Sequence, residues 1–153
     1  MKVTHELPPT YDADSKIVLL GTMPSPKSRE AGFPYSHPQN KMWPILADLL
    51  NETKPQTNAQ KRDFLLRNHI AMWDVLASCD ISGADDASIK NPKPNDLNRI
   101  YQAADIRATF TTGSKATALY KRFFDREPIA LPSTSPANCR FYNYDSLKKA
   151  YSV

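Results

Sequence analysis

The sequence is poor in the residues from which small proteins build metal centres, disulfide frameworks and phosphate-binding loops. It has two cysteines and three histidines in 153 residues, without the close pairs that zinc or iron–sulfur sites use. Two cysteines also suit a reducing cytosol better than a disulfide framework. Of the four glycines, the isolated Gly21 and Gly113 form neither a Walker loop nor a dinucleotide loop. We therefore predict a protein without a metal or a cofactor.

Long apolar runs are absent too. No segment approaches the roughly 20 apolar residues that a membrane-spanning helix needs, and the first residues lack the apolar core of a secretory signal. We expect a cytoplasmic protein without a membrane partner. The net charge of +4 at pH 7 is compatible with a polyanionic partner, although many small enzymes have a similar charge balance.

The hydrophobic pattern predicts the fold class. Hydrophobic residues make up 41% of the chain, which is typical of a globular protein, and the length suits a single domain over residues 1–153. Nearly continuous apolar runs predict strands that are covered on both faces, and helical spacing between them predicts helices. The order of these strands and helices along the chain indicates a three-layer α/β/α sandwich with a mostly parallel four-stranded central sheet. The predicted strands are residues 16–22, 70–76, 106–112 and 128–131, and the predicted helices are residues 42–50, 59–68, 95–103, 113–124 and 145–151.

Three residues in these segments suit helix ends. Asn51 can end the helix predicted over residues 42–50. Asn95 and Asp96 are good N-cap residues for the helix predicted over residues 95–103.

Ligands of parallel sheets bind beyond the carboxyl ends of the strands. The segments expected at that edge are rich in Ser, Thr, Gly and Pro, which can bind a ligand or phosphate oxygens through hydroxyls and backbone amides. Ordinary turn and helix-cap chemistry explains any one of them, whereas four on one edge favour a binding site. They are GTMPSPKS (residues 21–28), LASCDISGA (76–84), TTGSK (111–115) and LPSTSPAN (131–138).

Two polar residues have both a structural and a functional interpretation. Asp74 lies in the apolar run AMWDVL, where a buried carboxylate either accepts bonds from loop amides, which we favour, or belongs to a site. Asn40 follows Pro34 and Pro38 on a stiff loop and precedes a predicted helix. A carboxamide there can position a water or bind a leaving group, but Asn is also a common N-cap. Spacing alone does not separate these two roles of Asn40.

Three ordered motifs carry a family resemblance. They are GTMPSP (residues 21–26), FPYSHPQNKMW (33–43) and LPSTSPAN (131–138). Together they resemble the uracil-DNA glycosylase superfamily, and within it the hypoxanthine-DNA glycosylase group, also called DNA-deoxyinosine glycosylases, which is related to the mismatch-specific uracil/thymine branch. The blocks WDVLASCDI and NPKPND match as well, so the resemblance covers nearly the whole chain beyond its first residues.

The resemblance implies a monofunctional DNA glycosylase of base excision repair. Such an enzyme flips a deaminated nucleotide out of the DNA and hydrolyses its N-glycosidic bond, here with hypoxanthine as the expected base. No lysine is placed by the motifs to form a Schiff base, so no lyase activity is expected. The implied partner is DNA that contains a damaged or deaminated base, and we expect a monomer.

Two positions depart from the mismatch-specific pattern. Met23 replaces the Asn that positions the attacking water, and Met42 replaces the aromatic residue that stacks on the flipped base, although Trp43 is retained. The resemblance implies that Asn40 is the catalytic amide instead. Backbone N–H groups of residues 21–25 would stabilise the departing base together with Asn40.

The resemblance also implies a set of binding residues. The base pocket would comprise Gly21, Thr22, Met23, Pro24, Ser25, Phe33, His37, Met42 and Trp43. The DNA contacts would come from Lys27, Thr112, Lys115, Ser133, Thr134, Ser135, Pro136, Ala137, Asn138 and Arg140. Solvated surface charge is the alternative interpretation of the basic residues.

Other functions fit part of this pattern. The same site could act on uracil or on G:T and G:U mismatches. A catalytically idle DNA-binding module with the same fold would explain Met23. A small-nucleotide hydrolase would use the same edge of the sheet but would not prefer duplex DNA.

Overall fold

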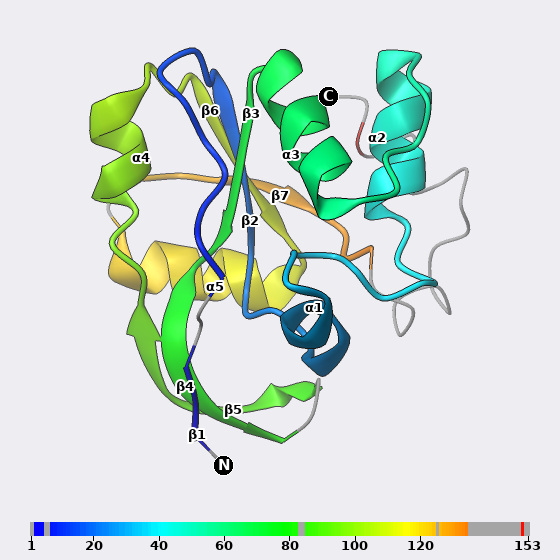
Figure 1. Ribbon diagram of the computed structural model, residues 1–153. Coiled ribbons are helices and arrows are strands. Elements are labelled where there is room, and N and C mark those ends of the chain that lie inside the picture. Colours follow the sequence, from blue (N-terminus) through cyan, green and yellow to red (C-terminus); the bar gives the residue numbers. More distant parts are fainter. Residues whose placement is uncertain (1, 5–6, 83–84, 125, 135–150, 152–153) are drawn as a thin grey trace.

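The computed structural model describes residues 2–4, 7–82, 85–124, 126–134 and 151. In chain order, the elements are β1 (Lys2–Thr4), β2 (Ile17–Gly21), α1 (Pro26–Ala31), α2 (Met42–Leu50), α3 (Asn58–Arg67), β3 (Ile70–Asp74), β4 (Leu76–Ser82), β5 (Asp85–Pro94), α4 (Asn98–Ala103), β6 (Ala108–Thr112), α5 (Ser114–Phe123) and β7 (Ile129–Leu131). Figure 1 shows their arrangement.

The central sheet has four parallel strands in the order β3-β2-β6-β7. In its middle, Leu19 of β2 lies beside Met72 of β3 and Phe110 of β6. Side chains alternate between the faces of a strand, so Leu19 packs in one hydrophobic cluster, and Val18 and Leu20 pack in the other. Both faces are buried, which is why the strand sequences are apolar without alternation. The predicted strands and their parallel arrangement are confirmed.

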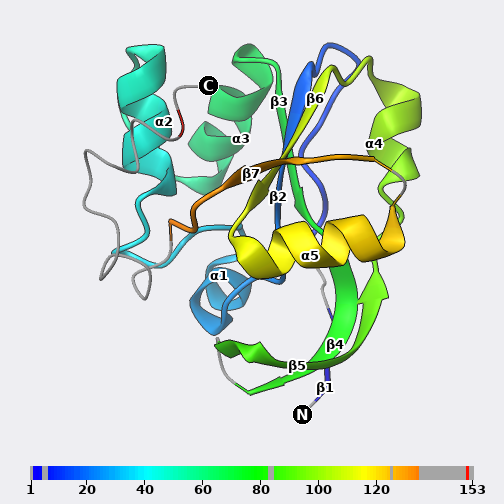
Figure 2. The ribbon, with the colours of Figure 1, turned by 180° about the vertical axis from the view of Figure 1, so that it is seen from behind.

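Helices cover both faces of this sheet. Trp43 of α2 and Phe64 of α3 pack with Leu19 on one face. Ile100 of α4 and Tyr120 of α5 pack with Leu20 on the other. Figures 1 and 2 show the two helix pairs on opposite sides of the strands. The predicted three-layer sandwich is therefore confirmed, and each large side chain buried in it contributes about 1.5–3 kcal/mol.

A second, antiparallel sheet was not predicted. Its order is β1-β4-β5, and it curves away at the bottom of Figure 1. The expectation of a loop over residues 76–84 was wrong, since most of that segment forms β4. Strand β5 contains Pro92 and Pro94, but it lies at the edge of its sheet and pairs with register shifts. A proline at an edge need not cost a ladder hydrogen bond.

The helix ends show which local signals hold. Helix α2 has its predicted bounds, and Asn51 ends it with a left-handed φ of 53°. Helix α3 begins at Asn58, one residue before its predicted start, because Thr57 and Gln60 form a capping box. Helix α1 was missed although it has the usual signals, namely Ser25 as N-cap, a proline at its start and a glycine at its end.

Helix α4 begins later than its Asn and Asp suggested. The side chain of Asn95 is buried, and its Nδ2 donates to the carbonyl oxygens of Asp74 at 2.9 Å and Leu76 at 3.0 Å. Asn95 therefore joins the end of β3 to the start of β4 instead of capping a helix. The helix itself starts at Asn98, after Leu97, without a side-chain cap. The helix predicted over residues 145–151 lies outside the described residues except for Tyr151, which is helical.

Candidate active site

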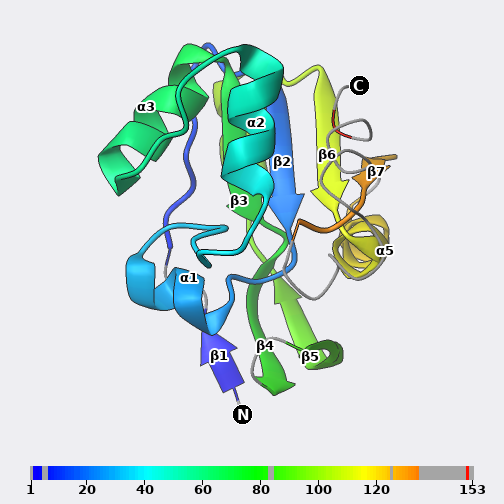
Figure 3. The same cartoon turned by 90° about the vertical axis from the view of Figure 1, so that its right-hand side faces the viewer.

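A cavity of about 140 Å³ lies at the carboxyl ends of β2, β3 and β6. In the sheet, β3 lies on one side of β2 and β6 lies on the other. The cavity is therefore at the switch point of the strand order, where α/β proteins bind ligands. Figure 3 shows α1 near the arrowhead of β2 at this edge. The cavity is lined by Gly21, Thr22, Met23, Pro24, Ser25, Ser28, Pro34, Tyr35, Asn40, Asp74, Ile81, Thr112, Ser133 and Thr134.

Three polar side chains converge on Gly21. A Cβ atom at this glycine would lie 2.5 Å from Oδ1 of Asp74, 3.0 Å from the hydroxyl of Tyr35 and 3.6 Å from Oγ1 of Thr112. The register of the sheet creates this approach, because Gly21 pairs directly with Asp74. A glycine is needed here for close approach, and the carboxylate of Asp74, which is 3% exposed, lines the cavity.

Substitution of Gly21 tests this convergence. Gly21→Ala is expected to lower the catalytic rate by about 10²-fold, because the new methyl group displaces Asp74 and small misplacements are costly in active sites. Gly32→Ala is a matched control, since Gly32 has a φ of +82° but lies outside the cavity lining. The control is expected to lose about 1 kcal/mol of stability with an unchanged rate. Steady-state rates and thermal melts of both variants give the comparison, and equal rates would contradict the assignment.

Tyr35 was not among the predicted site residues. Its backbone has a left-handed φ of +57°, and its carbonyl oxygen accepts a bond from Nε1 of Trp43 at 3.0 Å. Its hydroxyl lies 2.8 Å from Oγ1 of Thr112. Burial raises the pKa of Tyr35 well above its ordinary value, and the nearby Asp74 charge raises that pKa further. Tyr35 therefore remains a neutral hydroxyl at the wall of the cavity.

Asn40 combines the two roles that the sequence left open. Its Oδ1 accepts a bond from the backbone N–H of Met42 at 2.9 Å, which supports the first turn of α2, although Lys41 is the N-cap residue. Its backbone N–H donates to the carbonyl of His37 at 2.9 Å. Oδ1 already accepts the bond from Met42, so we expect a ligand to be bound by the other end of the side chain, the Nδ2 group, which is a donor. Asn40 also lines the cavity.

Thr134 supplies a buried hydroxyl to the same cavity. The residue is 1% exposed, and among the described residues its Oγ1 has no hydrogen-bond partner. Leaving a buried donor and acceptor unpaired costs about 1–3 kcal/mol. The Thr134 carbonyl accepts a bond from the N–H of Lys41 at 3.0 Å, which holds it beside the Asn40 loop. A ligand in the cavity is the natural partner for this hydroxyl.

Removal of this unpaired hydroxyl is expected to raise stability and to lower activity. Thr134→Val keeps the shape of the side chain and removes the hydroxyl, so the free energy of unfolding is expected to rise by up to about 1 kcal/mol. The kcat/KM is expected to fall about tenfold, the value of one hydrogen bond. Thr134→Ser is the control that keeps both properties near those of the parent. A Val variant that gains stability without losing activity would mean that the hydroxyl binds no substrate.

The structure brings many of the predicted site residues together. Residues 21–25 of the predicted base pocket line the cavity, as does the predicted catalytic residue Asn40. Thr112, Ser133 and Thr134, which were expected to contact the DNA backbone, line this cavity as well. Met23 is half-buried and also packs against the apolar cluster under α5. It therefore forms an apolar wall.

Four residues of the predicted base pocket lie elsewhere. Phe33, Met42 and Trp43 belong to the hydrophobic core instead, and Met42 is 0% exposed. Met42 cannot stack on a base without opening the core, because it begins the buried face of α2. The Trp43 ring lies 5.8 Å from that of Phe33, so it anchors the helix. His37 lines a neighbouring cavity.

The remaining predicted DNA contacts are spread around this edge of the sheet. Lys27 is exposed on α1, and Lys115 is half-buried in the first turn of α5. Ser135, Pro136, Ala137, Asn138 and Arg140 lie outside the described residues. Their roles stay predictions.

Five cavity residues were missed or weighed differently from the sequence. Ser28 and Ile81 had no signal beyond their segments, and Pro34 and Tyr35 lie within the FPYSHPQNKMW motif. For Asp74, a structural role was favoured. Its position as the last residue of β3, beside a glycine of β2, is the feature that points to the site.

Two further findings concern the described part of the chain. Within it, no group of three His, Cys, Asp or Glu side chains is arranged to hold a metal ion. None of its helices combines the length and the apolar character that crossing a membrane requires.

The parallel sheet and its polar cavity define an α/β domain with a small-ligand site at the switch point of the strand order. Residues 8–152 match the family model of the Uracil DNA glycosylase superfamily. The chain belongs to this superfamily, and its enzyme class is that of the DNA glycosylases, which hydrolyse N-glycosyl bonds. The resemblance seen in the motifs is thereby confirmed.

Individual relatives agree with this assignment. The chain is 30% identical to a hypoxanthine DNA glycosylase of Methanosarcina barkeri over 137 residues, which are 87% of each chain. It is 28% identical to a hypoxanthine DNA glycosylase of Methanosarcina acetivorans over 143 residues, covering 91% of this chain and 90% of the other. The solution NMR structure of a candidate uracil DNA glycosylase from Methanosarcina acetivorans is similar with a TM-score of 0.81 and 28% identity, over 99% of this chain and 97% of that chain.

Proposed function

We propose that this protein is a monofunctional DNA glycosylase that removes hypoxanthine from deoxyinosine in DNA. The names of its two Methanosarcina relatives support this choice of base. The observation that carries the proposal is the buried carboxylate of Asp74 in a cavity that also contains Asn40 and Thr134. These groups form an acceptor and donors around a space of about 140 Å³.

The carboxylate would favour a deaminated base over the adenine or cytosine from which that base forms. Hypoxanthine and uracil carry a ring N–H next to a carbonyl, whereas adenine and cytosine have a lone pair at that ring nitrogen. A carboxylate can only accept hydrogen bonds, so the Asp74 side chain would bind the ring N–H and repel the lone pair. The Nδ2 group of Asn40 or the hydroxyl of Thr134 would donate to the neighbouring carbonyl. A site built to pair polar groups strongly rejects ligands that leave them unpaired.

The same groups account for bond cleavage without a metal or a covalent intermediate. The nucleotide is first extruded from the duplex at a cost of a few kcal/mol, which is lowest for a mispaired base. Both electrons of the C1′–N bond then leave with the base, and the sugar gains oxocarbenium character. Donors from Asn40 and the backbone of residues 21–25 stabilise the negative charge on the base. Water adds to C1′ and loses a proton, and the base gains one.

Uracil is the second candidate base, because its ring N–H and carbonyl offer the same pairing to Asp74. Hypoxanthine is favoured since a bicyclic purine fills more of the cavity and gains more dispersion contacts than a single ring. The apolar wall at Met23 suits such packing.

The proposal is tested with labelled duplexes that contain inosine, uracil, xanthine or only ordinary bases. After incubation, alkali cleaves the strand where a base has been lost. Cleavage at inosine, with less at uracil and none in the ordinary duplex, is the expected result. Strand breaks that form without alkali would contradict the monofunctional assignment. Absence of alkali-labile sites in every duplex would leave only a DNA-binding module.

A further inference from the structure

A second cavity of about 110 Å³ lies next to the active-site cavity. The two share Tyr35 and Asn40 as lining residues, so a ligand in the second cavity would be a neighbour of the base. Lys54, Lys61 and His37 also line it, and none of the described residues that line it is acidic. Its lining thus has cationic and neutral donors without a carboxylate.

Lys61 is the unusual residue of this cavity. It is 9% exposed, and its Nζ donates to Oγ of Ser36 at 3.2 Å. The ammonium group lies 5.4 Å from the centre of the Trp43 ring and 5.9 Å from that of Phe33. Burial lowers the pKa of Lys61, and the charge of Lys54 lowers it further. A buried ammonium group without an anion is costly, and the aromatic rings offset only part of that cost.

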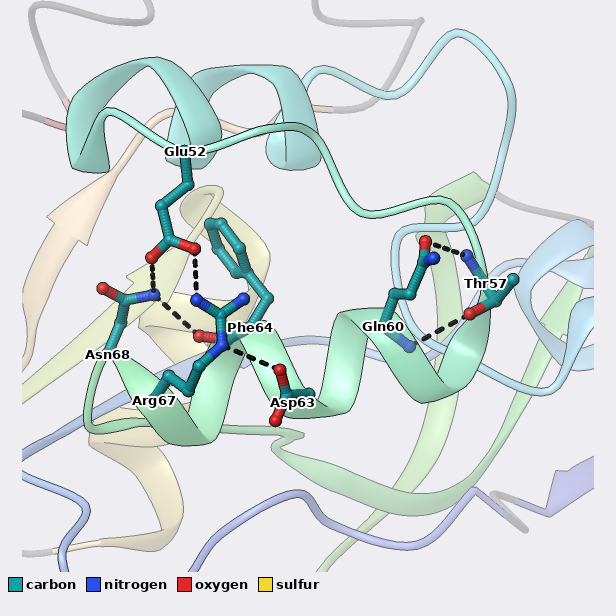
Figure 4. Close-up of polar contacts among 7 residues, drawn as sticks. All are labelled: Glu52, Thr57, Gln60, Asp63, Phe64, Arg67 and Asn68. Atoms are coloured by element: carbon teal, nitrogen blue, oxygen red, sulfur yellow. Dashed lines mark hydrogen bonds and ion pairs between the residues drawn. The ribbon is translucent and has the colours of Figure 1, made fainter.

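The nearby carboxylates of α3 and the loop before it are engaged elsewhere. Figure 4 shows Arg67 bonded to Asp63 and Glu52, with Asn68 also donating to Glu52. These contacts hold the carboxyl end of α3, while the capping box of Thr57 and Gln60 holds its amino end. Among the described residues, no ion pair is formed by Lys61. The helix is therefore fixed at both ends, and the cation between them has no ion-pair partner in the part of the chain that the structure describes.

The other donors suit the same kind of ligand. Nδ1 of His37 accepts a bond from the N–H of Gln39 at 3.1 Å, so the neutral ring carries its hydrogen on Nε2 and can donate from there. Ser36 Oγ donates to the carbonyl of Phe33 at 2.7 Å, which leaves it as an acceptor for Lys61. Two lysines and a histidine donor form a site for a small anion with several acceptor oxygens.

We propose that this cavity is a phosphate subsite that binds a phosphodiester of the DNA strand whose base occupies the active-site cavity. The proposal rests on the proposed function, since it takes DNA as the ligand. The shared walls Tyr35 and Asn40 place the subsite beside the flipped nucleotide, so the phosphate is one of those that flank it. Seating it there gives Lys61 its anion and holds Asn40 against the nucleotide.

The test uses Lys61→Met, which keeps an apolar stem against Trp43 and removes the charge. A second variant, Lys54→Ala, changes an exposed residue and covers the case in which the first fails to fold. Lys121→Met is the control, because Lys121 is exposed and forms an exposed ion pair with Glu127 at 3.8 Å. Melting temperatures show that each variant is folded.

Binding of an inosine duplex is measured by fluorescence anisotropy between about 50 and 200 mM salt. Each subsite variant is expected to weaken the Kd roughly tenfold and to reduce the salt slope by about 0.9, the value of one phosphate contact. Unchanged Kd and slope in the folded variants, or an equal loss in the Lys121 control, would overturn the proposal.

Neutral analogues of the phosphodiester identify which phosphate of the DNA contacts Lys61. Single methylphosphonates are placed at each position around the inosine, and one flanking position is expected to weaken binding by the parent but not by Lys61→Met. The subsite would be refuted if, at every position, the loss of affinity caused by the methylphosphonate simply added to the loss caused by Lys61→Met. It would also be refuted if free inorganic phosphate competed for the cavity but no phosphate of the duplex bound there. A failure of the proposed function is distinct, because the parent would then release no base while its binding could still be measured.

Discussion

Replacing Asn40 by alanine is expected to lower base excision by about 10²–10³-fold, the usual cost of removing one donor from a developing negative charge. DNA affinity is expected to change little, since the contact of the Nδ2 group strengthens only as the C1′–N bond breaks. Single-turnover excision and anisotropy on the same duplex measure the two effects. The alanine also removes the bond from the Met42 N–H to Oδ1, so some stability is expected to be lost.

Asn40→Asp separates the structural role from the catalytic one. The carboxylate keeps an acceptor for the Met42 N–H, and therefore most of the stability, but replaces the Nδ2 donor by an oxygen that repels a negative base. We expect near-normal thermal stability with excision as low as in the alanine variant. If the aspartate variant excised the base at the rate of the parent, Asn40 would be only a support for the start of α2.

The second large effect is expected at Asp74. Asp74→Asn replaces an obligate acceptor by an amide that can either accept or donate. Excision of hypoxanthine is expected to fall about 10²-fold, and the ratio of hypoxanthine to adenine excision is expected to fall by a similar factor, because the lone pair of adenine is no longer repelled. Competition between inosine and adenine duplexes measures this ratio directly.

Asp80→Asn is the matched control for this change. Asp80 lies on β4, accepts a bond from Nδ2 of Asn91 at 2.6 Å and does not line the cavity. Asp80→Asn removes the same negative charge at a position near Asp74 in the sequence. A general electrostatic effect would therefore appear in both variants. If selectivity were preserved in Asp74→Asn, Asp74 would return to the structural role that the sequence favoured.

Local sequence patterns were sufficient for the frame of the molecule. The central strands are apolar on both faces because helices cover them on both sides, and this burial is visible in a single segment such as residues 16–22. Helix α2 was predicted with its bounds, since its apolar stripe and Asn51 lie within one stretch of chain. Strands β4 and β5 were missed because their pairing depends on distant partners, such as Lys2 beside Asp80.

The candidate site divides in the same way. The motifs and the family resemblance were enough to predict residues 21–25, Asn40 and the segment that contains Thr134, since each lies within a contiguous sequence block. They also placed Met42 on the base, whereas helix packing puts it in the core.

Tertiary structure decided which polar groups meet. The register of β2 against β3 sets Gly21 beside Asp74, and the left-handed turn at Tyr35 carries its hydroxyl to Thr112. The contact between Lys41 and Thr134 brings two loops together that lie far apart in the chain. Burial patterns and helix ends are properties of neighbouring residues, so one sequence contains them. A binding cavity depends on the register and crossing of distant segments, which only the packed chain determines.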